Sequence, residues 1–194
     1  MAGLTFVELL VAMTVSAVLF AGITHVFTTQ RRGYVMRQQI AVMQQQSRDA
    51  MGFVTRELTM AGYDPTGCAC AGIETATAIT LRFTQDLNED GDITDAHEDV
   101  TYGLYDHAGD ADQDLGRDTG NGWDLVAENI ESVSFTYTLD DGTMTATPTN
   151  LKRIRAVDIA LIARTANRDA NYPLNSGYRT HSLAATVQVR NLGP

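Results

Sequence analysis

The feature that most constrains this chain is an apolar run of roughly 19 residues, Leu9–Phe27, close to its N-terminus. As an α-helix this run would be about 28 Å long, which is enough to cross the hydrocarbon core of a bilayer. One acidic residue, Glu8, lies at its start. A carboxylate costs about 2.5–3.5 kcal/mol at the bilayer centre and less near an interface, so such a residue is usually kept where it meets a partner. The sequence therefore predicts a membrane-spanning helix over residues 4–28.

The helix is predicted to continue beyond the membrane as an amphipathic segment, residues 29–62. Gly62 provides a natural stop, and Pro65 follows it shortly. Apolar or small residues recur at steps of three and four and form one stripe, at Ile40, Met43, Ser47, Ala50/Met51, Val54, Leu58 and Ala61. This stripe predicts that the segment packs on a domain formed by residues 63–194.

From residue 73 onward the apolar residues alternate with a period of two, which predicts β-strands. The expected strands lie near residues 79–83, 100–104, 133–137, 157–163 and 183–189, with a short return at 144–146 after the turn Asp140-Asp141-Gly142. Short strands joined by loops rich in Gly, Asp and Asn, with no helical period between them, predict an antiparallel sheet. The predicted fold class is α+β, with a long N-terminal helix packed on this sheet.

The charge of the chain is strongly acidic, with a formal net charge of −10. Between Gly62 and Asp124 only Arg82 and Arg117 oppose a large excess of carboxylates. Nucleic-acid binding needs a cationic surface that displaces counterions, so no nucleic-acid partner is expected. The sequence also lacks the Gly-x-Ser-x-Gly, His-Glu-x-x-His, phosphate-loop and dinucleotide motifs. We therefore expect a protein that is not an enzyme and requires no cofactor.

Part of the acidic region matches the first nine positions of an EF-hand-type calcium loop. Oxygen-bearing side chains occupy positions 1, 3, 5, 7 and 9, and Gly91 provides the sharp turn at position 6. Position 12 is His97 in place of glutamate, so Glu98 or Asp95 would have to substitute. A solvated hairpin loop is the alternative interpretation, since Asp, Asn and Gly are ordinary turn residues. The predicted ligands for Ca²⁺ are Asp86, Asn88, Asp90, Asp92, Thr94 and Glu98.

The two cysteines, Cys68 and Cys70, are separated by a single residue. Outside the cytoplasm they could oxidise, but a bridge across such a short ring would be strained and would close almost no loop. A local disulfide and two free thiols both remain open at this point.

The N-terminal sequence GLTFVELLVAM resembles the class III leader junction of type IV pilins and type II secretion pseudopilins. The resemblance implies that a prepilin peptidase cleaves after Gly3 and methylates the new terminal amine on Leu4, so that residues 1–3 are a leader. Glu8 would then be the fifth mature residue. In this family it is expected to form an ion pair with the terminal amine, here that of Leu4, of a neighbouring subunit.

Four later segments resemble PilW-type minor pilins: Arg56–Pro65, Leu125–Gly142, Ile154–Thr165 and Gly177–Asn191. The resemblance implies a single-pass inner-membrane protein with a periplasmic domain that later joins a cell-surface pilus. Its expected role is pilus initiation or assembly, in a priming or tip complex, and hence cell motility. The expected partners are the peptidase, other minor and major pilins, and the inner-membrane assembly platform.

Two alternatives stay open from the sequence. One is a J-type pseudopilin of a type II secretion system, and the other is a calcium-dependent, membrane-anchored adhesin or binding module. One signal also conflicts with a periplasmic domain. Arg31, Arg32 and Arg37 follow the apolar run, and the positive-inside rule taken alone would place the domain in the cytoplasm.

Overall fold

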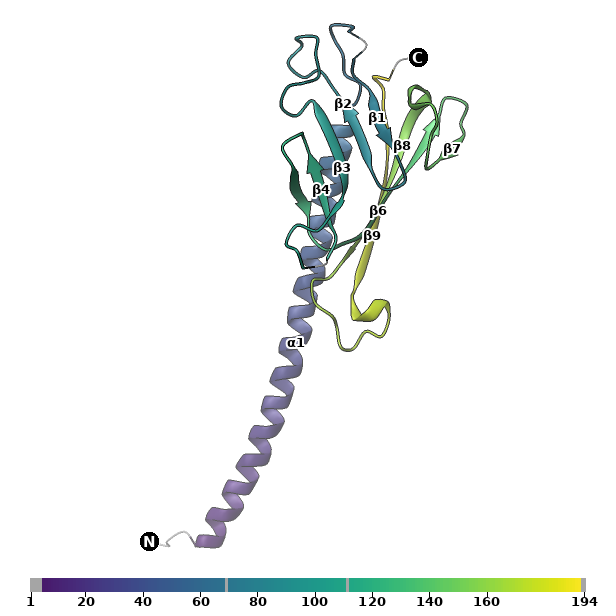
Figure 1. Cartoon of the computed structure of the whole chain (residues 1–194). Helices are drawn as coiled ribbons and strands as arrows, with labels where there is room; N and C mark the ends of the chain where they lie inside the picture. The colour runs from purple at the N-terminus through teal and green to yellow at the C-terminus, as the bar shows by residue number, and fades with distance from the viewer. Residues whose placement is uncertain (1–4, 69, 111, 193–194) are drawn as a thin grey trace. The chain divides into compact units, whose positions relative to one another are not determined.

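The computed structural model describes residues 5–68, 70–110 and 112–192, and the chain divides into two compact units, Met1–Ala41 and Val42–Pro194. The helix α1 (Phe6–Leu58) begins in the first unit and ends in the second (Figure 1). Gly3 and Leu4, the predicted cleavage and methylation positions, lie outside the described residues.

In the first unit, α1 exposes its apolar side chains. Thirteen large apolar residues between Phe6 and Phe27 are 48–75% exposed. By length and composition α1 contains a stretch that is able to cross a membrane. The predicted long apolar N-terminal helix is therefore present.

In the second unit, the remainder of α1 buries one stripe of residues: Met43, Ser47, Ala50, Met51, Val54 and Leu58. These residues belong to the predicted stripe, so the packing of this half-helix on the domain is confirmed. The helix ends at Leu58, and a turn leads to Gly62. Gly62 adopts φ +76°, a conformation that favours glycine, and its amide donates to the carbonyl of Thr84.

Five strands of the second unit form one antiparallel sheet in sequential order. They are β1 (Ile73–Ala76), β2 (Leu81–Thr84), β3 (Asp99–Tyr105), β4 (Asp114–Asp118) and β5 (Trp123–Ala127). The residues of this sheet that are almost fully buried include Leu81, Phe83, Val100, Tyr102 and Leu115. Glu57 of α1 forms hydrogen bonds to β3 and β4, which join the helix to this sheet.

The other four strands form a second antiparallel sheet in the order β7-β6-β8-β9. They are β6 (Ile130–Leu139), β7 (Met144–Thr145), β8 (Ile154–Arg164) and β9 (Thr180–Gln188), with short 3₁₀ helices η1 (Leu151–Arg153) and η2 (Asn175–Gly177) before β8 and β9. The sheets are linked where Phe135 donates its amide to the Ala78 carbonyl and the Tyr137 hydroxyl donates to the Thr77 carbonyl.

The predicted combination of a long helix with antiparallel β-structure is confirmed, but the strands form two sheets instead of the one expected. Strands β1, β4 and β5 were also not predicted. In β4, the charged residues Asp114 and Arg117 are buried, so the strand does not show an apolar alternation. Gly116 in this strand lies under the stacked rings of Tyr105 and Trp123, whose centroids are 5.6 Å apart.

Candidate functional site

The first candidate site is the N-terminal turn of α1, where Thr5 and Glu8 form reciprocal hydrogen bonds. The Thr5 amide and hydroxyl both donate to Glu8 Oε2 at 2.8 Å, and the Glu8 amide donates to Thr5 Oγ1 at 3.3 Å. This arrangement is a capping box, which satisfies donors that a helix start would otherwise leave unpaired. The pattern Thr-x-x-Glu is a sequence signal for such a box, and the prediction that concentrated on the charge of Glu8 did not use it.

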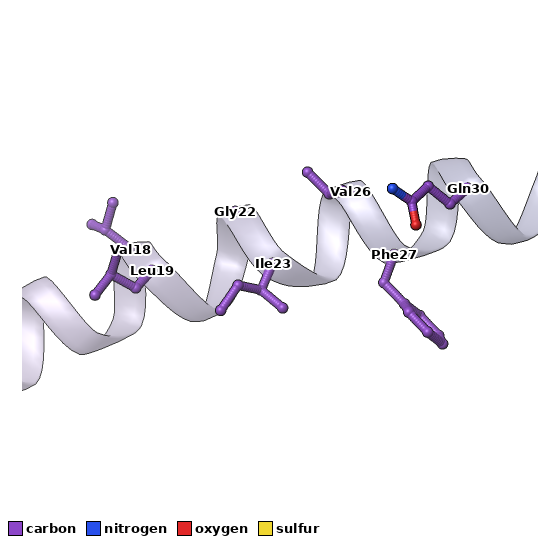
Figure 2. Close-up of a pocket in the computed structure, with 7 residues that line it drawn as sticks. All are labelled: Val18, Leu19, Gly22, Ile23, Val26, Phe27 and Gln30. Atoms are coloured by element: carbon purple, nitrogen blue, oxygen red, sulfur yellow. The ribbon is translucent and has the colours of Figure 1, made fainter.

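The helix surface that follows Glu8 is apolar and open. Seven residues along this helix line an open pocket, and they are labelled in Figure 2: Val18, Leu19, Gly22, Ile23, Val26, Phe27 and Gln30. An added Cβ on Gly22 would have no heavy atom within 4 Å. Gln30 is the one polar member and marks the end of the apolar surface. Such a surface is suited to lipid chains or to other apolar helices, and it offers no group for catalysis.

The second candidate site is the acidic loop between β2 and β3. Two of its predicted calcium ligands, Asp86 and Glu98, are buried and accept hydrogen bonds from the loop backbone. Asp86 accepts from the amides of Glu89 and Gly91, at 2.7 and 3.1 Å. Glu98 accepts from the amides of Leu87, Asn88 and Asp95, at 2.8, 3.3 and 3.3 Å. These two carboxylates therefore shape the loop from the inside.

Three other carboxylates of the loop converge at its surface. Oxygen atoms of Asp90, Asp92 and Asp95 all lie within 4.8 Å of one another. The side-chain amide of Asn88 donates to Asp90 at 3.0 Å and to Asp95 at 2.7 Å. Calcium binds oxygen at about 2.3–2.6 Å, so ligands on opposite sides of one ion are about 5 Å apart, and this spacing fits that ion. The calcium site stays a prediction, and these exposed groups are the ones that would hold the ion.

Two exposed carboxylates of the loop have pKa values that are shifted in opposite directions. The backbone amide and hydroxyl of Thr94 donate to Asp92 and hold the pKa of that carboxyl below its ordinary value. The hydrogen bond from Asn88 lowers the pKa of Asp95, but desolvation and the charges of Asp90 and Asp92 outweigh it and leave that pKa raised. The cluster is therefore one in which like charges repel, and a cation would relieve this repulsion.

The cysteine loop lies beside the acidic loop. Cys68 and Cys70 are joined by a disulfide bond, and the backbone amide of Cys68 donates a hydrogen bond to Asp64 Oδ1 at 3.1 Å. Thr66 donates its hydroxyl to Asp86 at 3.4 Å, which connects the two loops. With its sulfur atoms bridged, this segment has no free thiolate to act as a nucleophile or metal ligand.

A polar cluster around the buried residues Tyr102 and Arg117 connects α1 to β3 and β4, and it was not predicted from the sequence. Arg117 donates to both carboxylate oxygens of Glu57 at 2.9 Å, and the Tyr102 hydroxyl also donates to Glu57. His97 Nδ1 lies 3.3 Å from Arg117 Nη1, and the guanidinium lies 5.9 Å from the ring centroid of Phe53. Burial, with the bond to Glu57, raises the pKa of Tyr102 well above its usual range. The cluster holds the helix on the sheet, and two of its members also line an open pocket formed by Asp49, Ala50, Phe53, Arg117, Asp124, Leu125 and Val126.

Comparisons with known proteins give a likeness among solved structures. No family model and no curated protein matches the chain. Among solved structures, a type IV-like pilin from Thermus thermophilus is similar to it, with 14% sequence identity, a TM-score of 0.46, and coverage of 81% of this chain and 98% of the other.

Proposed function

We propose that this chain is a minor pilin of the PilW type, which acts in the initiation or assembly of a type IV pilus. A prepilin peptidase would cleave it after Gly3 and methylate Leu4, and it would wait in the inner membrane with its domain in the periplasm. It would then join other minor and major pilins at the assembly platform. The chain is the substrate of processing enzymes and a structural subunit, with no chemistry of its own.

The observation that carries this proposal is the junction sequence Gly3-Leu4-Thr5-Phe6-Val7-Glu8 directly before an apolar helix that its own chain leaves uncovered. Burying a large apolar side chain is worth roughly 1.5–3 kcal/mol, and thirteen of them are exposed between Phe6 and Phe27. A membrane or a bundle of like helices is the environment that removes this surface from water. The antiparallel domain on the second half of α1 is consistent with the same class of protein.

Glu8 would supply the specific contact in the filament. Its carboxylate and the terminal amine of a neighbouring subunit's Leu4 would be desolvated together in an apolar core. Removing one partner of a buried ion pair costs about 3–5 kcal/mol, because the other charge is left uncompensated. That penalty would align each new subunit at the position where the pair forms.

The direct test is mass spectrometry of the mature N-terminus from a strain with active peptidase. We expect a chain that begins at N-methylated Leu4. An intact Met1, or an unmethylated Leu4, would contradict the assignment. An intact N-terminus together with ligand binding that is lost on chelation would favour the calcium-dependent adhesin.

Two variants separate the charge of Glu8 from its capping role. Glu8→Gln keeps an oxygen that can accept from Thr5 but removes the charge. We expect it to be processed and inserted yet absent from filaments. Thr5→Ala removes the capping hydroxyl, at a cost of about 1 kcal/mol, and keeps the charge. We expect it to enter filaments, so the opposite pattern would show that helix capping and not the ion pair controls assembly.

A deletion strain distinguishes the pilus from the secretion system. Lost twitching motility with normal protein export supports the pilus. Lost export with normal motility would assign the chain to a type II secretion filament as a J-type pseudopilin.

A further inference from the structure

Three arginines that follow the apolar surface of α1 have no carboxylate near them in the sequence. Arg31, Arg32 and Arg37 are exposed, and no acidic residue occurs between Glu8 and Asp49. Among residues 5–68, 70–110 and 112–192, no ion pair involves these three side chains. In a chain with 24 acidic and 14 basic residues, this lack of a counter-charge is notable. Within the described part of the chain these arginines are therefore available to an external anion.

The arginines lie at the depth of lipid headgroups when the apolar part of α1 spans a bilayer. Phe6–Phe27 is about 33 Å long as a helix, close to the hydrocarbon thickness of about 30 Å. Arg31 and Arg37 then lie about 6 and 15 Å beyond Phe27 along the axis. Side chains of an α-helix lean toward its N-terminus, which is the membrane side here, so even the guanidinium of Arg37 can approach the phosphate layer. Gln30 is the last of the seven residues labelled in Figure 2, and Arg31 follows it directly in the sequence.

The arginines surround the helix instead of occupying one face. At about 100° per residue, Arg32 and Arg37 lie about 100° and 240° around the axis from Arg31. Headgroups surround a spanning helix on all sides, whereas the surface of one protein partner would meet a single face. Tyr34, which is 71% exposed in the same segment, is the kind of residue that is enriched at membrane interfaces.

We propose that Arg31, Arg32 and Arg37 form a collar that binds the phosphate groups of anionic phospholipids in the leaflet next to the domain. The proposal rests on the membrane-spanning helix of the proposed function. It also gives the arginines a role that does not depend on the positive-inside rule. The charges of the two units support it: Met1–Ala41 carries three arginines and one glutamate, a net charge of +2, and Val42–Pro194 carries 11 basic and 23 acidic residues, a net charge of −12. An anionic surface would attract the collar and repel the domain.

The test uses the full chain reconstituted in phosphatidylcholine vesicles, with trace spin-labelled phosphatidylglycerol or spin-labelled phosphatidylcholine. Electron paramagnetic resonance measures the fraction of each probe that is immobilised by the protein. We expect phosphatidylglycerol to be preferred, by up to about fivefold for each arginine that reaches the surface, and the preference to fall as salt is added. The variant Arg31→Gln/Arg32→Gln/Arg37→Gln should show no preference.

The matched control is Arg48→Gln/Arg56→Gln, which removes two exposed arginines farther along α1 and should keep the preference of the parent. Equal binding of the two lipids by the parent, or an unchanged preference in the triple variant, would overturn the proposal. A parent chain that carbonate extracts from the vesicles would overturn both the collar and the membrane-spanning role. Failure to enter filaments with the lipid preference intact would contradict only the pilin function.

Discussion

Removing one member of the buried pair Glu57–Arg117 should destabilise the domain far more than removing an exposed ion pair. The Arg117 side chain is 8% exposed and that of Glu57 is 20% exposed. In Glu57→Met the guanidinium of Arg117 stays buried without its carboxylate, and we expect the free energy of unfolding to fall by about 4–5 kcal/mol. In Arg117→Met the less buried carboxylate keeps the Tyr102 hydroxyl, so we expect a smaller loss of about 3 kcal/mol.

The double variant Glu57→Met/Arg117→Met should be less destabilised than Glu57→Met alone. Apolar residues of similar volume often replace a buried ion pair without net cost. What remains is the buried Tyr102 hydroxyl without its acceptor, a cost of about 1–3 kcal/mol. The two substitutions should therefore be strongly non-additive, as expected for residues in direct contact.

The measurement is urea unfolding of the full chain in detergent micelles, followed by far-ultraviolet circular dichroism. Thermal unfolding gives a second measure, because in a domain of this size a loss of 4–5 kcal/mol in the free energy of unfolding lowers the thermal midpoint by roughly 10–20 °C. The control is Arg82→Met, which breaks the pair between Arg82 and Asp99 on the same sheet. These side chains are 46% and 35% exposed, and we expect a loss of at most about 1 kcal/mol.

Two results would refute this reasoning. If the double variant lost as much stability as the two single variants together, Glu57 and Arg117 would act independently. If Arg82→Met were as harmful as Arg117→Met, burial would not be the source of the effect.

Gly116→Ala should lower the free energy of unfolding by about 1–3 kcal/mol, because the added Cβ would lie 2.6 Å from two aromatic rings. Gly52→Ala, on the open face of α1, should raise it by up to about 1 kcal/mol. Equal effects of the two variants in urea unfolding would contradict this expectation. Burial and the bond to Glu57 raise the pKa of Tyr102 above its ordinary 10.0, so its contribution to stability is full below pH 10 and is lost as the pH rises further. Tyr102→Phe should flatten this alkaline decline in the unfolding midpoint, and an unchanged slope would exclude the residue as a source. Calcium should raise the melting temperature, and Asp90→Asn/Asp92→Asn should abolish this rise; a parent that does not respond to calcium would contradict the calcium site.

Features of the fold that depend on local periodicity could be predicted from the sequence. The buried stripe of α1, from Met43 to Leu58, follows steps of three and four. The central strands β6 and β8 alternate apolar and polar residues, because one face of each is buried. A single periodic segment is enough to reveal such elements.

Features that depend on distant partners could not be predicted. Glu57 lies next to the polar face of its helix and Arg117 in a charged stretch, so each reads as solvent-exposed, although they meet across 60 residues. In the acidic loop, the sequence indicated a set of oxygen ligands. It could not show that Asp86 and Glu98 turn toward backbone amides, because that depends on the path of the loop. The division into two sheets likewise depends on pairing between strands that are far apart in the chain.

The way α1 is held in the second unit has a mechanical consequence. The helix is attached through Glu57 to strands β3 and β4. Just beyond the end of the helix, the side-chain amide of Asn191 donates to the carbonyls of Thr59 and Ala61. A pull along the helix axis would therefore load the Arg117 fork and the buried apolar stripe as well as the covalent turn at 59–62. Tension on the helix would be shared between the five-stranded sheet and the backbone that follows the helix.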